Sequence, residues 1–228
     1  MKIGGLQKCS LIDYPGKISA IVFTIGCNFR CPYCHNPELV DETATEMTEE
    51  EIFSFLERRK NLLDAVTITG GEPTVHDDLI PFIERIRALG FLVKLDSNGT
   101  NPDMLKEVFA RGLVDYIAMD IKSPLQKYSE TVARPVDVGK IRESIALIMK
   151  SGVDYEFRTT VVKSLLSPED ILKIVGEIHG AKQYFLQKFV PTKTLNPAFI
   201  RKTTYTDAEF EDMRIMLSPY VEACAVRA

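Results

Sequence analysis

The sequence lacks the features that mark membrane, secreted and nucleic-acid-binding proteins. None of its apolar runs approaches the roughly 18 residues needed to cross a bilayer, and its N-terminus, MKIGGLQKCS, has no basic-then-apolar signal segment. Basic residues are not in excess, since 28 Lys and Arg stand against 32 Asp and Glu. No overall positive field therefore favours nucleic acid or an anionic membrane. We expect a cytoplasmic protein that binds neither.

Linkers, repeats and a disulfide framework are absent as well. No stretch rich in Ser and Gly or in Pro marks a domain boundary, so we expect one domain over residues 1–228. With 45% apolar and 26% charged residues, the chain can bury an ordinary core. Its five cysteines are an odd number, and three of them, Cys27, Cys31 and Cys34, fall within eight residues. Such crowding favours a metal site over disulfides.

Six short runs rich in β-forming residues recur along the chain and predict strands. They cover residues 20–25, 65–69, 91–96, 114–120, 153–162 and 183–190. Segments with helical spacing lie between them and begin at capping signals, such as Thr48 with Glu51 and Thr206 with Glu209. Four of these segments are followed by a glycine of the kind that ends helices, namely Gly90, Gly112, Gly152 and Gly180.

The alternation of strands and helices predicts an α/β fold with a parallel sheet. A closed barrel needs eight such units and about 250 residues, whereas six are found here. We therefore predict an open-sided, partial (β/α)6 barrel of the TIM type over residues 20–220. A short β element, residues 1–19, precedes it, and a C-terminal segment, residues 221–228, follows it. In parallel sheets of this kind, chemistry gathers at the carboxyl ends of the strands.

The clustered cysteines follow the first predicted strand of the barrel, at its carboxyl end. Three thiolates on one short loop can bind zinc, copper(I) or an iron–sulfur cluster. Structural zinc needs four protein ligands, and the nearest fourth candidate, His35, stands directly beside Cys34. A four-iron cluster held by three cysteines would leave one iron open for a substrate or cofactor. Counting ligands favours the open cluster, with zinc as the alternative.

The C-x3-C-x2-C pattern, with Tyr33 before the third cysteine, resembles the radical S-adenosylmethionine (SAM) superfamily. The resemblance implies a four-iron, four-sulfur cluster on Cys27, Cys31 and Cys34, with SAM bound at the open iron and Tyr33 among the cofactor contacts. It also implies an oxidoreductase that cleaves SAM reductively to a 5′-deoxyadenosyl radical.

A second motif, Gly70-Gly71-Glu72, follows the second predicted strand of the barrel. By itself the motif reads as a plain turn. Together with the cysteine loop, it looks like the GGE motif of the same superfamily. That resemblance implies that the backbone of this motif holds the amino group of SAM.

Carboxylates end the next two strands, within Asp96-Ser97-Asn98 and Met119-Asp120-Ile121-Lys122. Asp-Ser-Asn-Gly is also a strong turn former, and Asp120 could simply pair with Lys122. Both segments are similar to elements of glycyl-radical-enzyme activases. That resemblance implies that Asp96, Ser97, Asn98, Asp120 and Lys122 bind SAM, and that Asp96, Ser97, Met119 and Asp120 surround a monovalent cation. Ser97 replaces the usual Thr and keeps the hydroxyl.

Two polar residues lie inside the last predicted strands. Arg158 interrupts a β-branched and aromatic run, so it either faces an anion in the barrel lumen or lies on an exposed face. The family resemblance places a basic residue here for the SAM carboxylate. Gln187 is a weaker analogue of a polar lumen residue that contacts SAM.

The N-terminal segment Ile12-Asp13-Tyr14-Pro15-Gly16-Lys17 resembles activating proteins of anaerobic ribonucleoside-triphosphate reductases. The resemblance implies a glycyl radical enzyme as protein substrate and a low-potential electron donor such as flavodoxin or ferredoxin. One alternative is a radical SAM enzyme that acts on a small molecule or peptide, and another is a non-catalytic zinc-binding protein. No catalytic role is predicted for Cys9 or Cys224.

Overall fold

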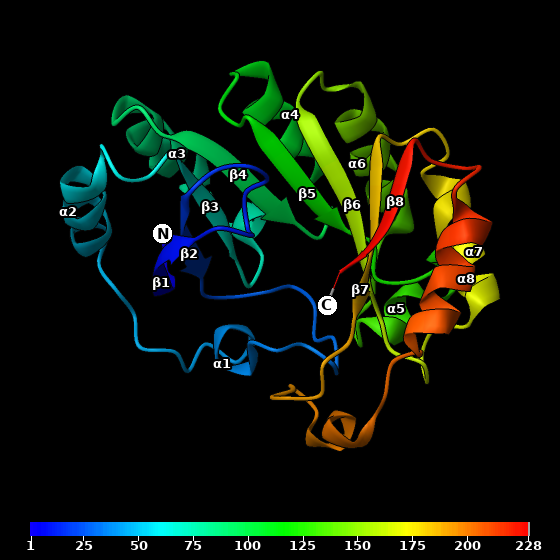
Figure 1. Ribbon diagram of the computed structural model, residues 1–228. Coiled ribbons are helices and arrows are strands. Elements are labelled where there is room, and N and C mark those ends of the chain that lie inside the picture. Colours follow the sequence, from blue (N-terminus) through cyan, green and yellow to red (C-terminus); the bar gives the residue numbers. More distant parts are fainter. Residues whose placement is uncertain (228) are drawn as a thin grey trace.

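The strands of the computed structural model, which describes residues 1–227, form one curved sheet (Figure 1). They are β1 (Ile3–Ser10), β2 (Ser19–Thr24), β3 (Ala65–Gly70), β4 (Leu92–Ser97), β5 (Tyr116–Asp120), β6 (Asp154–Val161), β7 (Gln183–Lys188) and β8 (Ala223–Arg227). β1 is antiparallel to β2, whereas β2 to β8 are parallel and follow the sequence order. No pairing joins β1 to β8 within residues 1–227, so the predicted open-sided barrel is confirmed.

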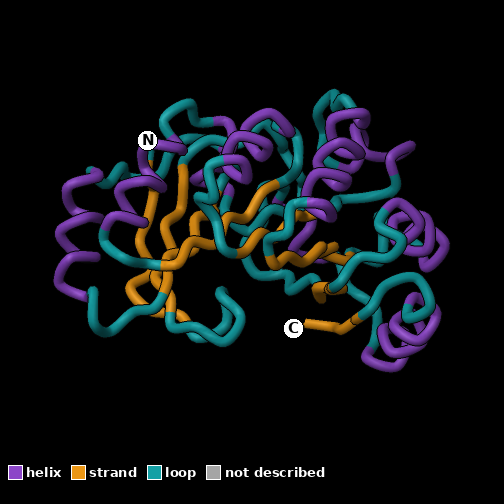
Figure 2. Tube along the Cα trace, turned by 90° about the horizontal axis from the view of Figure 1, so that it is seen from above, coloured by secondary structure: helices purple, strands orange, loops and turns teal. Residues whose placement is uncertain are grey.

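Helices cover the outer, convex side of this sheet (Figures 1 and 2). The longer ones are α2 (Glu49–Arg59), α3 (Leu79–Ala88), α4 (Pro102–Ala110), α6 (Val138–Lys150), α7 (Pro168–Glu177) and α8 (Asp207–Leu217). Short helices, α1 (Pro37–Val40) and α5 (Tyr128–Thr131), and the 3-10 turns η1 (Pro73–Val75), η2 (Leu125–Lys127) and η3 (Pro197–Arg201) lie in the connections.

The predicted helix ends are confirmed. Thr48 and Glu51 form a reciprocal capping box at the start of α2, and Thr206 and Glu209 form another at the start of α8. The four glycines expected to end helices all have positive φ angles. Local capping chemistry therefore sets the lengths of the helices that cover the sheet.

The two faces of the sheet carry different side chains. Val66, Ile68 and Leu95 are fully buried and pack in the hydrophobic core between the sheet and the helices. Because side chains alternate along a strand, their neighbours Thr67 and Lys94 face the concave side, which we call the lumen. The outer face is thus apolar, whereas the lumen is lined by polar and charged groups.

Residues 223–227 of the C-terminal segment form a strand, β8. β8 pairs in parallel with β7 over five residue pairs, from Gln183 with Ala223 to Gln187 with Arg227. The structure therefore has seven parallel strands where the sequence predicted six. The sequence ACAVR carries a weak strand signal, because alanine has low β propensity, so its pairing partner decides its conformation.

The N-terminal element forms a hairpin whose connecting loop covers residues 11–18. Tyr14 in this loop is 6% exposed, and its ring packs against Tyr116 at a centroid distance of 5.7 Å. Because β2 begins at Ser19, directly after the loop, Tyr14 covers the amino ends of the parallel strands. The segment that resembles the reductase-activating proteins thus lies at the opposite end of the barrel from the cysteines.

No helix within residues 1–227 combines the length and the apolar character needed to cross a membrane.

We expect Tyr14→Ala to lower the free energy of unfolding by about 3–5 kcal/mol, because it removes a buried aromatic ring. Ile12→Ala, in the same loop but 86% exposed, is the matched control and should change it by less than about 0.5 kcal/mol. Urea unfolding followed by circular dichroism measures both values. Equal effects of the two substitutions would contradict the conclusion that Tyr14 is a buried packing residue at the amino ends of the parallel strands.

Candidate active site

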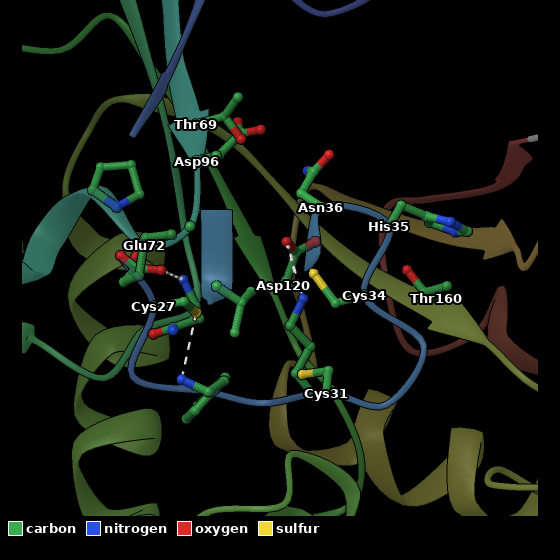
Figure 3. Close-up of a pocket in the computed structure, with 18 of the residues that line it drawn as sticks. Cys27, Cys31, Cys34, His35, Asn36, Thr69, Glu72, Asp96, Asp120 and Thr160 are labelled. Carbon is green, nitrogen blue, oxygen red and sulfur yellow. Dashed lines mark hydrogen bonds and ion pairs between the residues drawn. The ribbon is translucent and has the colours of Figure 1, made fainter. Parts of the chain in front are cut away.

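The three clustered cysteines lie in the loop that follows β2, at the carboxyl ends of the parallel strands (Figure 3). The Gly26 amide donates to the Leu39 carbonyl at 2.8 Å, which fixes the start of the loop. The Cys34 amide donates to the Cys31 carbonyl at 3.0 Å, which forms a tight turn between these two cysteines. Together with Cys27, both side chains line one cavity of about 220 Å³.

Most residues predicted to bind the cofactor line the same cavity. They are Tyr33, Gly70, Gly71, Glu72, Asp96, Ser97, Asn98, Asp120 and Lys122. They belong to the cysteine loop and to the ends of β3, β4 and β5. Arg158, Gln187 and Met119 do not line it. Parallel strands therefore bring distant segments together at one rim, as the sequence predicts.

The cysteines suit a cluster better than a single metal ion. Within residues 1–227, no three His, Cys, Asp or Glu side chains converge closely enough to hold one ion. Zinc requires such convergence, whereas a four-iron cluster binds each cysteine through a different iron. The proposed fourth zinc ligand, His35, has its Nδ1 3.0 Å from the Lys193 carbonyl oxygen and its ring stacked on Phe189.

Burial acts on all three thiols. It raises the pKa of Cys27 to about 12 and that of Cys31 to about 11, and it also raises the pKa of Cys34. The Lys122 ammonium opposes this effect at each cysteine. Cysteine binds metal as the thiolate. The positive charge of bound iron would therefore have to offset the effect of burial on the pKa of these thiols.

The Gly70-Gly71-Glu72 loop lies against the start of the cysteine loop. The Gly71 amide donates to the Thr24 carbonyl at 2.9 Å, and the Glu72 amide donates to the Gly26 carbonyl at 2.8 Å. A Cβ atom on Gly71 would lie 1.9 Å from the Gly26 carbonyl oxygen. Only glycine therefore permits this close approach of the two loops.

Glu72 is 1% exposed and points toward the end of β4. Its carboxylate accepts from the Asn98 amide at 2.6 Å, from the Ser97 hydroxyl at 2.9 Å and from the Thr74 amide at 3.1 Å. Burial raises the pKa of Glu72, although these donors oppose the shift. Glu72 therefore holds the β3 and β4 ends together.

Asn28 is a site residue that the sequence reasoning missed. Its side-chain oxygen accepts from the Asn98 side chain at 2.8 Å, and its amide nitrogen donates to the Thr100 hydroxyl at 2.7 Å. These bonds attach the cysteine loop to the end of β4. The sequence does contain one indication that Asn28 belongs to the site, because Asn28 directly follows Cys27.

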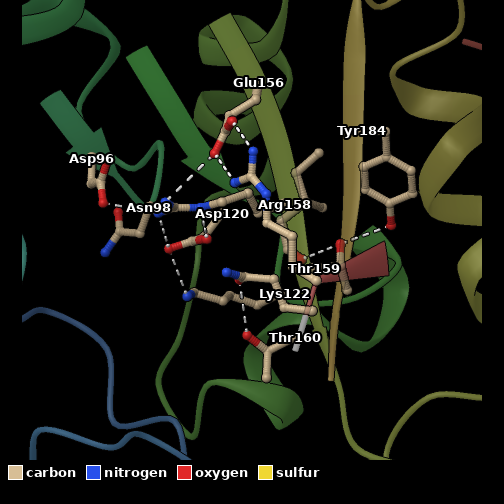
Figure 4. Close-up of polar contacts among 12 residues, drawn as sticks. Asp96, Asn98, Asp120, Lys122, Glu156, Arg158, Thr159, Thr160 and Tyr184 are labelled. Atoms are coloured by element: carbon tan, nitrogen blue, oxygen red, sulfur yellow. Dashed lines mark hydrogen bonds and ion pairs between the residues drawn. The ribbon is translucent and has the colours of Figure 1, made fainter. Parts of the chain in front are cut away.

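Arg158 lies in the lumen, which decides between the two predicted locations (Figure 4). Its side chain is 12% exposed, and its guanidinium contacts Asp120 at 2.9 Å through Nε and Asp96 at 3.2 Å through Nη2. Lys122 lies 3.3 Å from Asp120. Burial alone would raise the pKa of Asp120, but Arg158 and Lys122 hold it well below its usual range.

Three more charged residues form ion pairs in this group but do not line the cavity. The sequence did not predict them as site residues. Lys94 lies 2.6 Å from Asp96, and Arg227 of β8 donates two hydrogen bonds, at 2.7 and 2.8 Å, to the buried Glu156. Glu156 also lies 3.8 Å from Arg158. The sequence does contain one indication of this group. Lys94 and Asp96 are two residues apart in a strand, so their charged side chains share one face of the sheet.

Three of the four expected cation ligands already have polar partners in the protein. Asp96 and Asp120 contact the cations described above, and the Ser97 hydroxyl donates to Glu72. Met119 is fully buried, and its side chain fills the space beneath Gly99. Binding of a monovalent cation by these four residues stays a prediction.

Gln187 lies at the edge of the site rather than in its cavity. Its side-chain oxygen accepts from the Thr160 hydroxyl at 3.4 Å. The two residues line a neighbouring hollow together with His35. Contact between Gln187 and SAM remains a prediction.

Comparison with known proteins agrees with this geometry. The model of the Radical SAM superfamily matches residues 21–176, so the chain belongs to this superfamily and is a radical SAM enzyme. Membership implies a four-iron, four-sulfur cluster and SAM, which the three cysteines and the cavity fit.

Two curated relatives resemble the chain over most of its length. A protein of Methanocaldococcus jannaschii, whose name assigns it provisionally as a glycyl-radical enzyme activating enzyme, is 35% identical, with 99% of this chain and 95% of that protein covered. A pyruvate formate-lyase-activating enzyme of Clostridium pasteurianum is 27% identical, with 85% and 83% covered.

Solved structures share the fold at low sequence identity. SuiB of Streptococcus suis bound to S-adenosylmethionine has a TM-score of 0.70 and 13% identity, with 91% of this chain and 49% of SuiB covered. TYW1 with a lysine-pyruvate adduct has a TM-score of 0.59 and 18% identity, with 88% and 72% covered. The chain thus spans about half of the length of SuiB.

We expect Cys31→Ala to abolish the visible absorption of the anaerobically purified protein while its far-ultraviolet circular dichroism is largely kept, because a cluster ligand is lost but the fold is not. Cys9→Ala, at an exposed position outside the site, should keep the absorption. An unchanged spectrum of Cys31→Ala would disprove the ligand assignment.

We expect Gly71→Ala to weaken SAM binding by about tenfold or more, because the added Cβ would displace the loop from Gly26. Gly176→Ala in α7 is the control, since a Cβ there meets nothing within 4 Å, and it should leave SAM binding unchanged. Titration of SAM against the cluster's electron paramagnetic resonance (EPR) signal measures both. Similar affinities for the two variants would contradict the close-packing argument.

Proposed function

We propose that this protein is a glycyl-radical-enzyme activating enzyme, with an anaerobic ribonucleoside-triphosphate reductase as its protein substrate. The relative of Methanocaldococcus jannaschii, which matches nearly the whole chain, is the observation that carries this proposal. The pyruvate formate-lyase-activating enzyme of Clostridium pasteurianum adds support. The Ile12-to-Lys17 segment supports the choice of the reductase as partner.

The residues around the cavity have separate tasks in this proposal. Cys27, Cys31 and Cys34 would hold the cluster, and the backbone of Gly70 and Gly71 would approach the amino group of SAM closely. With one electron from a reductant, the bound cofactors would supply a 5′-deoxyadenosyl radical and release methionine. The radical would take one hydrogen atom from the α-carbon of a glycine, which gives 5′-deoxyadenosine and a glycyl radical. The chain itself supplies binding and orientation.

The fixed charges at the rim would orient SAM before any electron arrives. Arg158 holds Asp120 in place, and Lys122 reaches the cavity from the end of β5. Because these groups are already paired and largely buried, little reorganisation is needed when the amino and carboxylate groups of SAM bind.

The open side of the barrel supports a protein substrate. β1 and β8 do not pair within residues 1–227, so the sheet does not surround the lumen. A loop of another protein needs such an opening to bring its glycine to the cavity. The electron would come from a low-potential donor such as flavodoxin or ferredoxin.

We expect a glycyl radical EPR doublet when the anaerobic holoenzyme, SAM, a reductant and an anaerobic ribonucleoside-triphosphate reductase from the same organism are mixed. The same reductase with its radical-site glycine changed to alanine should give no doublet. Release of 5′-deoxyadenosine is measured in parallel. SAM cleavage without any partner-dependent doublet would contradict the proposal and favour a small-molecule or peptide substrate.

A further inference from the structure

Lys94 is a buried lysine that has no part in the proposed mechanism. Its side chain is 2% exposed, and its Nζ lies 2.6 Å from Oδ1 of Asp96. On its other side, Nζ lies 6.0 Å from the centre of the Tyr116 ring. Asp96 lines the cavity, whereas Lys94 does not, so the ammonium lies behind the Asp96 carboxylate. Burial of an unpaired ammonium group is strongly destabilising. The ion pair between Lys94 and Asp96 therefore fixes the positions of both side chains.

Charged groups of the chain occupy all four carboxylate oxygens of Asp96 and Asp120. Oδ1 of Asp96 contacts Lys94, and Oδ2 contacts Arg158. Oδ1 of Asp120 contacts Arg158, and Oδ2 contacts Arg158 and Lys122. A free cation between the two carboxylates would have to compete with these tethered groups.

The balance of charge in the lumen points the same way. Ion pairs connect three carboxylates, those of Asp96, Asp120 and Glu156, with four cations, Lys94, Lys122, Arg158 and Arg227. Glu72, the remaining buried carboxylate of the site, binds only neutral donors. With Glu72 counted, four carboxylates of the site stand beside four tethered cations, so a free monovalent cation would enter a place where the negative charge is already matched.

We propose that Lys94 is a tethered cation, which fixes Asp96 and makes SAM binding independent of a free monovalent cation. Lys94 is a positioning residue, because it acts on the cavity through Asp96. The proposal needs only that the site binds SAM and does not depend on the identity of the protein substrate. A failed glycyl radical assay would therefore leave it standing.

The first test uses the unaltered holoenzyme. SAM is titrated against the EPR signal of the reduced cluster in potassium, sodium or tetramethylammonium chloride at equal ionic strength. Tetramethylammonium is too large and too weakly coordinating to replace a cation bound to carboxylates. We expect the three dissociation constants for SAM to agree within about twofold, since the chain supplies the charge. A loss of about tenfold or more in tetramethylammonium would overturn the proposal.

The second test removes the tethered charge. We expect Lys94→Met to bind SAM about tenfold more weakly in tetramethylammonium chloride, as is usual for loss of a hydrogen bond to a charged group, and potassium or sodium should restore part of the affinity. Lys163→Met, which breaks an exposed pair with Glu209, is the control and should match the unaltered protein. If Lys94→Met does not fold, Lys94→Gln removes the charge but keeps a neutral donor for Asp96, so a smaller loss of affinity in tetramethylammonium, again restored by potassium or sodium, is expected. Unchanged affinity in tetramethylammonium, or no recovery with potassium or sodium, would show that Lys94 has only a structural role.

Discussion

The ion pairing of Arg158 with Asp96 and Asp120 is the interaction on which the lumen depends. Arg158 is on β6, whereas the two carboxylates end β4 and β5, so one guanidinium joins three neighbouring strands. Its planar group of donors suits this bridging, because several N–H bonds leave one rigid plane. Unpaired, any of these buried charges would be strongly destabilising. The lumen can therefore be charged only because its charges are matched.

Polar contacts continue from this group to both ends of the barrel. Toward the amino ends, Glu156 accepts from the Tyr116 hydroxyl, and the Tyr116 ring packs against Tyr14 of the N-terminal loop. Toward the carboxyl ends, Glu72 and Asn98 connect the loops after β3 and β4 to the cysteine loop. The cavity thus has a rigid floor and rim, which is what a site that must orient a flexible cofactor requires.

Local signals predicted much of this protein. The capping pairs, the helix-ending glycines and the β-rich runs gave the order of elements, because each depends on residues only a few positions apart. The cysteine spacing and the Gly70-Gly71-Glu72 motif placed the site, since parallel strands bring their carboxyl ends to one rim. β8 was missed because its sequence has low β propensity, and its hydrogen bonds are made to β7, which is distant in the sequence.

The sequence by itself determined the fold class, the cluster loop and most residues that line the cavity. Only the tertiary structure decided that Arg158 faces the lumen, that Glu72 joins two strand ends, and that Lys94 and Arg227 belong to the same charged group. The physical reason is that a strand pattern shows which side chains share a face, but not which charges from other strands face them. Those partners are set by the register of the sheet and by the curvature that encloses the lumen.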